Sequence, residues 1–322
     1  VLAAGWPESV PATTVDRQCG SSQQALHFAA QGVMAGAYDI AIAGGVETMT
    51  RVPMGASIGS GVGFPFGPSV RRRYEPAGGL VPQGISAEMI AERWNLSRTD
   101  LDELGARSQQ LALQATEEGR FEDELVPIEV KDADGNLTGE VLSGDEGLRP
   151  GTTAETLAKL KPAFKPDGKV TAGNSSQITD GASAVLVMSE ERANDLGLVP
   201  RARFVGFAVV GVDPVTMLTG PIPATRRVLE RSKLDLDEID LVEINEAFAS
   251  VVLAWEKELH PDMAKVNVNG GAIALGHPLG ASGTKLMATL LNELERTEGR
   301  YGLQTMCEGG GLANATIIER LG

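Results

Sequence analysis

Short apolar runs that end in glycines alternate along this chain with segments of helical periodicity. Residues 38–43 form one such run before a pair of glycines, and residues 303–306 form another before Cys307 and three glycines. The helical pattern that precedes the first run ends at Gly36. Alternating strands and helices predict an α/β fold built of layers. The repetition alone is weak evidence of a duplicated domain, since the pattern recurs in many α/β proteins.

The same patterns place the remaining elements and divide the chain into three parts. Residues 49–177 differ from their surroundings because they contain a glycine-rich loop at 55–67 and two amphipathic helices, the second with Ser97 as its expected N-cap. We expect an N-terminal domain of residues 1–48 plus 178–192, an inserted loop subdomain of residues 49–177, and a C-terminal domain of residues 193–322. Further strands are expected at 182–188, 203–210, 241–244 and from 315, and helices at 86–94, 97–118, 223–232, 246–259 and 281–296.

The composition is typical of a globular protein and limits its partners. Hydrophobic residues make up 42% of the 322 residues, and the formal net charge is −15. An acidic chain is a poor candidate for non-specific nucleic acid binding, which depends on phosphate neutralisation. No apolar run reaches the ~18 residues that a membrane span needs, and residues 1–11 lack a signal-peptide pattern, so we expect a cytoplasmic protein. The arginine run at 71–73 is either a solvated loop or a local anion site.

The chain has only two cysteines, too few for a disulfide framework. Cys19 stands at the start of a predicted helix, where unpaired N–H groups and partial positive charge favour a thiolate. Cys307 ends a predicted strand before three glycines, whose N–H groups could bind an oxyanion. Each cysteine could instead be a small buried residue, and its own segment leaves both interpretations open.

Two polar residues stand in segments that make them candidates for a chemical role. His277 lies in a loop with five glycines and precedes a proline, a setting that we expect to present the imidazole rather than bury it. Asn245 follows a predicted strand and opens the sequence Asn-Glu-Ala-Phe. Its side chain either caps the next helix or holds a water molecule or a carbonyl oxygen.

Taken together, these four segments resemble the thiolases. That family shares a cysteine motif, an Asn-Glu-Ala-Phe motif, a Gly-His-Pro motif and a Cys-x-Gly-Gly-Gly motif, and all four occur here in that order over most of the chain. The resemblance implies duplicated α/β domains in a layered αβαβα arrangement with an inserted loop subdomain. It also implies an acyltransferase of the bacterial degradative type. Such an enzyme cleaves a 3-ketoacyl-CoA with CoA, or runs the reverse condensation, through an acyl-cysteine.

The resemblance assigns catalytic roles to individual positions. Cys19 matches the nucleophile, and His277 matches the residue that activates it and helps to stabilise the thioester oxyanion. Cys307 matches the second cysteine, which moves protons. Asn245 matches the asparagine that orients a water molecule in one oxyanion hole, and the N–H groups of Cys19 and Gly309 match the second hole.

The resemblance also implies how substrate is held. Arg149, Ala172 and Ser176 lie where the family contacts CoA, and Ala247 and Phe248 line the same pantetheine tunnel. Coenzyme A is a substrate in this chemistry, and no metal or redox cofactor is implied. Acyl-CoA and CoA are the expected partners, with self-association as a dimer or a tetramer.

Two departures from the family pattern bear on these expectations. Gln83 lies in Pro-Gln-Gly, where many short-chain members have His-Met-Gly beside the acyl pocket, so a roomier pocket is expected. Family members also carry a segment before the cysteine motif, so we expect this sequence to be part of a longer chain.

Three other functions are alternatives to this one. An acetyl-CoA acetyltransferase specific for acetoacetyl-CoA and a non-catalytic acyl-CoA-binding protein both stay possible. A decarboxylating ketoacyl synthase fits poorly, because that class uses Cys-His-His.

Overall fold

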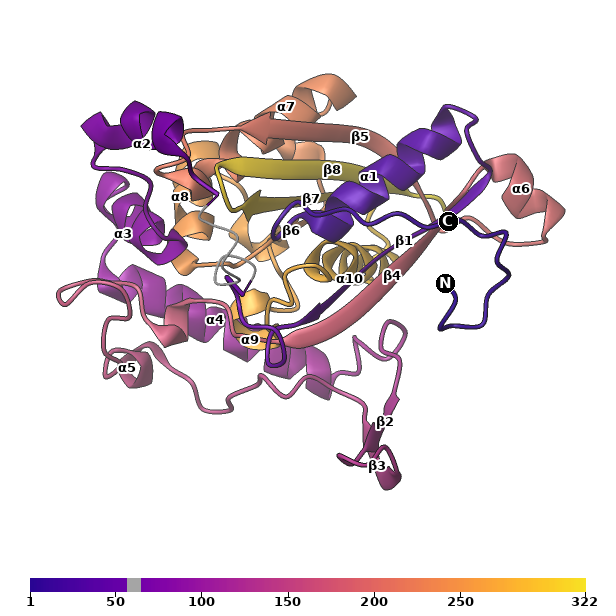
Figure 1. The fold of residues 1–322 in the computed structure, drawn as a ribbon, viewed down its shortest axis with the longest axis horizontal. Coiled ribbons are helices and arrows are strands. Elements are labelled where there is room, and N and C mark those ends of the chain that lie inside the picture. The colour runs from indigo at the N-terminus through magenta and orange to yellow at the C-terminus, as the bar shows by residue number, and fades with distance from the viewer. Residues whose placement is uncertain (57–64) are drawn as a thin grey trace.

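The structure, a computed structural model, describes residues 1–56 and 65–322 (Figure 1). Residues 57–64 of the predicted glycine-rich loop lie outside the described residues. The largest sheet has four strands in the order β5-β8-β7-β6, in which β6 and β7 are parallel and the other neighbours antiparallel. Its strands are β5 (Ala202–Gly211), β6 (Leu241–Ile244), β7 (Tyr301–Glu308) and β8 (Leu312–Arg320).

A second sheet pairs two strands that lie far apart in the sequence. β1 (Ile40–Thr48) runs antiparallel to β4 (Asp180–Met188) along its whole length. The predicted bounds of this strand, residues 38–43, were wrong at both ends, because it starts at Ile40 and both following glycines take part in the pairing. Gly45 also lies against the backbone of Gly280, because a Cβ there would be 1.8 Å from the carbonyl oxygen of Gly280. β1 was expected to be buried, but its alternate side chains are exposed, because helices cover only one face of this pair.

Helices separate and cover these sheets. α1 (Ser21–Met34) and α10 (Ser282–Arg296) pack against each other between the β1–β4 pair and the four-stranded sheet (Figure 1). α7 (Pro221–Ser232) and α8 (Ala249–Leu259) cover the opposite side, where Trp255 is fully buried in the main core. The prediction of a layered α/β fold is therefore confirmed. The small α6 (Glu190–Asp195) and α9 (Ala272–Leu275) lie in the connections.

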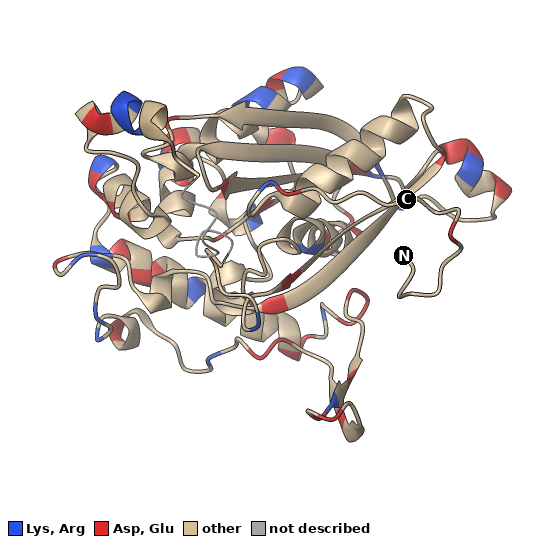
Figure 2. Cartoon of the chain, viewed as in Figure 1, with Lys and Arg blue, Asp and Glu red and all other residues tan. Residues whose placement is uncertain are grey.

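The segment between β1 and β4 contains helices and a projecting hairpin (Figure 1). Ser97 caps α4 as predicted: its side chain accepts a bond from the N–H of Asp100, whose carboxylate accepts one from the N–H of Ser97. The arginines at 71–73 lie on an exposed helix rather than on a loop, because Pro68 starts a helix there (Figure 2). The elements are α2 (Pro68–Tyr74), α3 (Gln83–Arg93), α4 (Arg98–Glu117), β2 (Ile128–Lys131), β3 (Leu137–Leu142) and α5 (Ala154–Leu157).

Most predicted elements are present, with shifted ends. β6 has the predicted bounds, whereas β7 continues beyond the predicted 303–306 and includes Cys307. α8 begins three residues later than predicted, at Ala249. Among the described residues, no helix combines the length and the apolar character that crossing a membrane requires.

We predict that Gly283→Ala destabilises the fold, because α1 and α10 touch through backbone at that point. A Cβ on Gly283 would lie 2.1 Å from the backbone nitrogen of Gln23, so one helix has to shift. Overpacking of this kind lowers the free energy of unfolding by about 1–3 kcal/mol. Urea denaturation followed by circular dichroism measures the loss. The control is Gly144→Ala, whose Cβ meets nothing within 4 Å; equal stability of both variants would contradict the prediction.

Candidate active site

A sharp turn presents Cys19 just before α1. Gln18 adopts a left-handed backbone with φ of 52°, which is uncommon for a residue with a side chain and clusters at functional sites. The N–H groups of Gly20 and Ser21 close the turn on the carbonyl oxygens of Arg17 and Gln18, at 3.1 and 3.2 Å. This turn, which the sequence analysis did not anticipate, fixes the direction of the Cys19 side chain.

The Cys19 thiol is buried and holds its proton tightly. Burial first, and then the charge of Glu308, raise its pKa to about 11. The Gln83 side chain and the N–H groups of Gly309 and Cys19 hydrogen-bond to the thiol and lower the pKa, but by less. The predicted preference for thiolate at a helix start is therefore wrong for this resting structure. The helix begins only at Ser21, and desolvation dominates.

Cys307 lies close to Cys19 at the end of β7. Its thiol is fully buried, and burial together with the neighbouring Cys19 raises its pKa well above the usual value. The chain turns immediately afterwards, with Gly310 and Gly311 both at positive φ, and this turn brings the N–H of Gly309 to Cys19. The structure thus brings Cys19, Cys307, Gly309 and Gln83 together, although they are far apart in sequence.

The hydrogen bonds around His277 favour one tautomer of its ring. The Ser282 hydroxyl donates to the carbonyl oxygen of Pro278 at 2.9 Å and lies 2.5 Å from His277 Nδ1, so Nδ1 carries the hydrogen and donates. Nε2 then accepts from Asn245 Nδ2 at 3.3 Å. Burial lowers the pKa of His277 to about 4, so the ring is neutral at pH 7. The expectation of an exposed imidazole was wrong, because the glycine-rich loop folds inward and leaves the ring 3% exposed.

Asn245 does not cap a helix. Phe248, whose backbone is extended, is the N-cap of α8, and the N–H of Ser176 bonds to the carbonyl oxygen of Ala247 just before it. The N–H of Asn245 continues the sheet by donating to Thr305, two residues before Cys307. Its Oδ1 is buried and has no hydrogen-bond partner among the described residues, so it is available to a bound molecule.

Glu246 anchors the Asn245 segment to the His277 loop, a role that the sequence analysis missed. Its carboxylate accepts bonds from Ser108 Oγ at 2.6 Å, Asn267 Nδ2 at 2.9 Å and the N–H of Ile273 at 3.2 Å. Burial nevertheless raises its pKa, since desolvation exceeds the effect of these bonds. The only available signal was a charged residue within the Asn-Glu-Ala-Phe motif.

The residues expected to bind CoA divide into two groups. Ser176, Ala247 and Phe248 lie together, and Phe248 contacts the ring of Phe164 edge-on at 6.0 Å between centroids. Arg149 is exposed, and its guanidinium donates to carbonyl oxygens of its own loop, at Glu146 and Leu148. Ala172 is exposed in a short 3₁₀ turn. No hydrogen bond or ion pair within the described residues joins Arg149 or Ala172 to the cysteines.

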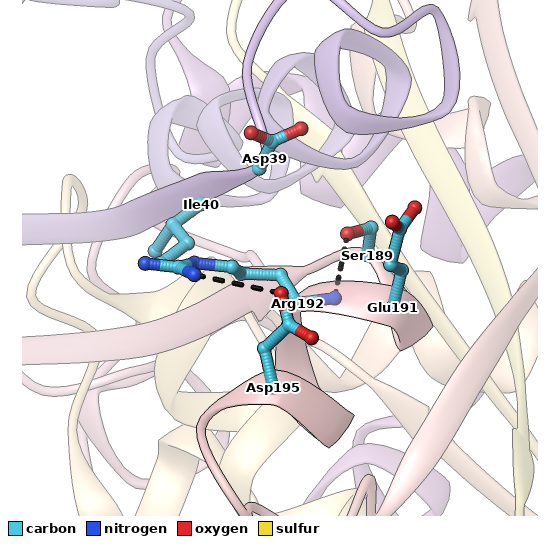
Figure 3. Close-up of a pocket in the computed structure, with 6 residues that line it drawn as sticks. All are labelled: Asp39, Ile40, Ser189, Glu191, Arg192 and Asp195. Carbon is cyan, nitrogen blue, oxygen red and sulfur yellow. Dashed lines mark hydrogen bonds and ion pairs between the residues drawn. The ribbon is translucent and has the colours of Figure 1, made fainter.

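A surface pocket away from the two cysteines has an acidic lining. It lies where β1 begins and α6 ends, and its lining includes neither cysteine (Figure 3). Arg192 pairs with Asp195, three residues further along α6, at 3.6 Å, which leaves the other carboxylates to dominate the charge of the pocket. An acidic lining disfavours the phosphates of CoA. The residues are Asp39, Ile40, Ser189, Glu191, Arg192 and Asp195. In the described part of the chain, no three His, Cys, Asp or Glu residues are grouped as metal ligands.

Comparison with known sequences identifies the family. The family described as "Thiolase, N-terminal domain" matches residues 1–191, and "Thiolase, C-terminal domain" matches residues 198–320. The chain belongs to the thiolase family. A steroid 3-ketoacyl-CoA thiolase, FadA6, from Mycobacterium tuberculosis is 51% identical over 99% of this chain and 77% of the relative. A 3-ketoacyl-CoA thiolase from Bacillus subtilis is 46% identical over 98% of this chain and 81% of the relative.

Solved thiolase structures share the fold. The dimeric peroxisomal thiolase of Saccharomyces cerevisiae superposes with a TM-score of 0.89 at 40% identity, covering 99% of this chain and 79% of the other. Human mitochondrial 3-ketoacyl-CoA thiolase in complex with CoA gives 0.87 at 39% identity, covering 99% and 80%. The predicted thiolase fold and the prediction of an acyltransferase are confirmed.

We predict that alkylation of Cys19 by iodoacetamide is slow and rises steeply with pH. With a pKa of about 11, roughly one thiol in a thousand is ionised at pH 8, and the rate should rise about tenfold per pH unit. The rate is measured between about pH 7 and 10 in Cys307→Ala, where Cys19 is the only cysteine. Gln83→Leu, which removes a donor that lowers this pKa, should slow alkylation further. A plateau below pH 9 would contradict the account.

Proposed function

We propose that this thiolase works as a degradative 3-ketoacyl-CoA thiolase, with Cys19 as the acyl carrier and Cys307 as the proton carrier. The observation that supports this most directly is the pair of buried cysteines with the N–H groups of Gly309 and Cys19 directed at one of them. A sulfur that must be both nucleophile and leaving group suits thiol–thioester exchange better than a hydroxyl does. The same residues run the reverse condensation of acetyl-CoA.

The first half of the proposed reaction forms the acyl-enzyme. Cys19 transfers its proton to His277 Nε2 as its sulfur attacks the 3-keto carbon of the substrate. The bond between carbons 2 and 3 then breaks and leaves the acyl group on Cys19. The electron pair goes to the departing acetyl-CoA enolate, which takes the proton of Cys307 and becomes acetyl-CoA.

The second half regenerates the enzyme. The Cys307 thiolate takes the proton of incoming CoA, whose sulfur attacks the thioester carbon on Cys19. The tetrahedral intermediate expels Cys19 as thiolate, which recovers its proton from His277, and shortened acyl-CoA leaves. Cys307 ends as the thiol, so one group acts as acid and then as base, and the proton count balances.

Two oxyanions develop in this scheme, and the site offers two sets of donors. The N–H groups of Gly309 and Cys19 already lie at the sulfur that bears the acyl group, so they are placed for the oxyanion of the acyl-enzyme step. The second set consists of His277, protonated after it accepts the proton, and a water molecule held by the unpaired Oδ1 of Asn245. Losing one such donor typically costs 10²–10³ in rate.

The proposed substrate is a 3-ketoacyl-CoA longer than acetoacetyl-CoA. Gln83 borders Cys19 from the first turn of α3, so the residue beside the acyl carbon is a flexible amide. Two relatives carry 3-ketoacyl-CoA thiolase names, and one of these names specifies a steroid. A structure titled acetyl-CoA acetyltransferase from Bacillus anthracis is also similar, with a TM-score of 0.88 at 44% identity, which keeps short-chain specificity as the alternative to test. Cytoplasmic location and a dimeric or tetrameric state stay predictions.

The substrate proposal predicts that CoA-dependent cleavage of a medium-chain 3-ketoacyl-CoA is faster than cleavage of acetoacetyl-CoA. Absorbance of the ketoacyl-CoA–magnesium complex follows both reactions. Cys19→Ala should lose roughly 10⁴–10⁶-fold in kcat, as expected when a covalent nucleophile is removed. Faster cleavage of acetoacetyl-CoA would favour the short-chain alternative. Binding of both substrates without cleavage by the folded wild-type chain would favour an acyl-CoA-binding protein.

A further inference from the structure

A buried ion pair joins the two cysteine segments. Arg17 precedes Cys19 by two residues, and Glu308 directly follows Cys307. Arg17 Nε lies 2.7 Å from Glu308 Oε2, with the Glu308 side chain fully buried and that of Arg17 18% exposed. The pair therefore connects the turn before α1 with the end of β7, the two places from which the sulfurs project.

Two further contacts hold this pair in one arrangement. Arg17 Nε donates its hydrogen to Asn314 Oδ1 on β8 at 3.0 Å, and Asn314 Nδ2 donates to Gln24 Oε1 on α1 at 3.3 Å. On the other side, the Glu308 carboxylate fills the space where Gly20 would have a side chain, with a Cβ only 2.1 Å from Oε1. The carboxylate is thus enclosed by the turn that carries Cys19.

Stability alone is a weak reason for such a pair. Removing two charges from water is costly, and buried ion pairs often contribute no more than apolar residues of the same volume. A buried pair instead fixes the relative position of the two segments that carry it. If the segments shift, each charge loses its partner but stays out of water, which is unfavourable. Here the two segments belong to the N-terminal and C-terminal family domains, residues 1–191 and 198–320.

We propose that Arg17 and Glu308 are positioning residues that hold Cys19 and Cys307 at the separation that acyl and proton transfer require. The proposal rests on the proposed roles of the two cysteines. Neither Arg17 nor Glu308 has to touch substrate for this role. Reaction rates are sensitive to such placement, since a misplacement of 1 Å costs up to about 10²-fold.

The experiment uses a bifunctional thiol reagent, dibromobimane, which becomes strongly fluorescent after it bridges two thiols. The chain has only two cysteines, so an intramolecular bridge reports their juxtaposition directly. The fraction of labelled protein that becomes crosslinked is compared in wild type, Arg17→Met, Glu308→Gln and the double variant. The kcat and the KM for CoA are measured for the same four proteins. We expect single variants to crosslink less and to lose about 10–100-fold in kcat, with KM within about twofold. The double variant should lose no more than the worse single variant.

The controls separate positioning from folding and from the proposed function. Glu319→Gln removes a carboxylate from β8 that pairs with Arg203 and Arg300 far along the same sheet, and it should leave crosslinking and kcat unchanged. Arg17→Lys, which keeps the charge, should stay folded and recover much of the crosslinking. Unchanged crosslinking and kcat in both single variants would overturn the proposal, as would additive losses in the double variant. A wild type that crosslinks but cleaves no ketoacyl-CoA would refute the proposed function instead.

Discussion

The close approach of the start of α1 to the four-stranded sheet and to α10 governs this site. Gly20 lies against the Glu308 carboxylate and Gly283 against the backbone of Gln23, at distances that a side chain would prevent. These contacts bury both sulfurs and direct the N–H of Gly309 at Cys19. The two thiols are thereby kept away from bulk water, with only a few hydrogen-bond donors of the protein beside them.

Burial also sets the charge state of the resting site. It raises the pKa of Cys19 to about 11 and lowers that of His277 to about 4, so both groups are neutral at pH 7. Charge separation between them is unfavourable until a substrate carbonyl accepts the developing negative charge. The sulfur therefore becomes nucleophilic as it reacts, and the free enzyme is protected from adventitious electrophiles. The buried Oδ1 of Asn245 has no hydrogen-bond partner among the described residues and is therefore available to a ligand.

Periodicity and short motifs predicted most of the fold, because secondary structure depends on local pattern. The roles of the site residues came from the resemblance to the thiolases and stay predictions. β6 was predicted with its observed bounds. The surroundings of the site residues could not be predicted, because they depend on residues distant in sequence. The inward fold of the His277 loop, the bond from the N–H of Ser176 to Ala247 and the raised pKa of Cys19 all arise from such contacts. Glu308 gave one signal, a charge inside a glycine motif, but its partner Arg17 is visible only in three dimensions.

The central claim is that Cys19 carries the acyl group. The most direct measurement is to mix the wild-type enzyme with acetyl-CoA, quench in acid, digest, and locate the acetyl group by peptide mass spectrometry. The account predicts acetylation of the peptide that contains Cys19, its removal when free CoA is added before the quench, and no adduct in Cys19→Ala. Acetylation confined to Cys307, or no adduct in a chain that still cleaves ketoacyl-CoA, would contradict it.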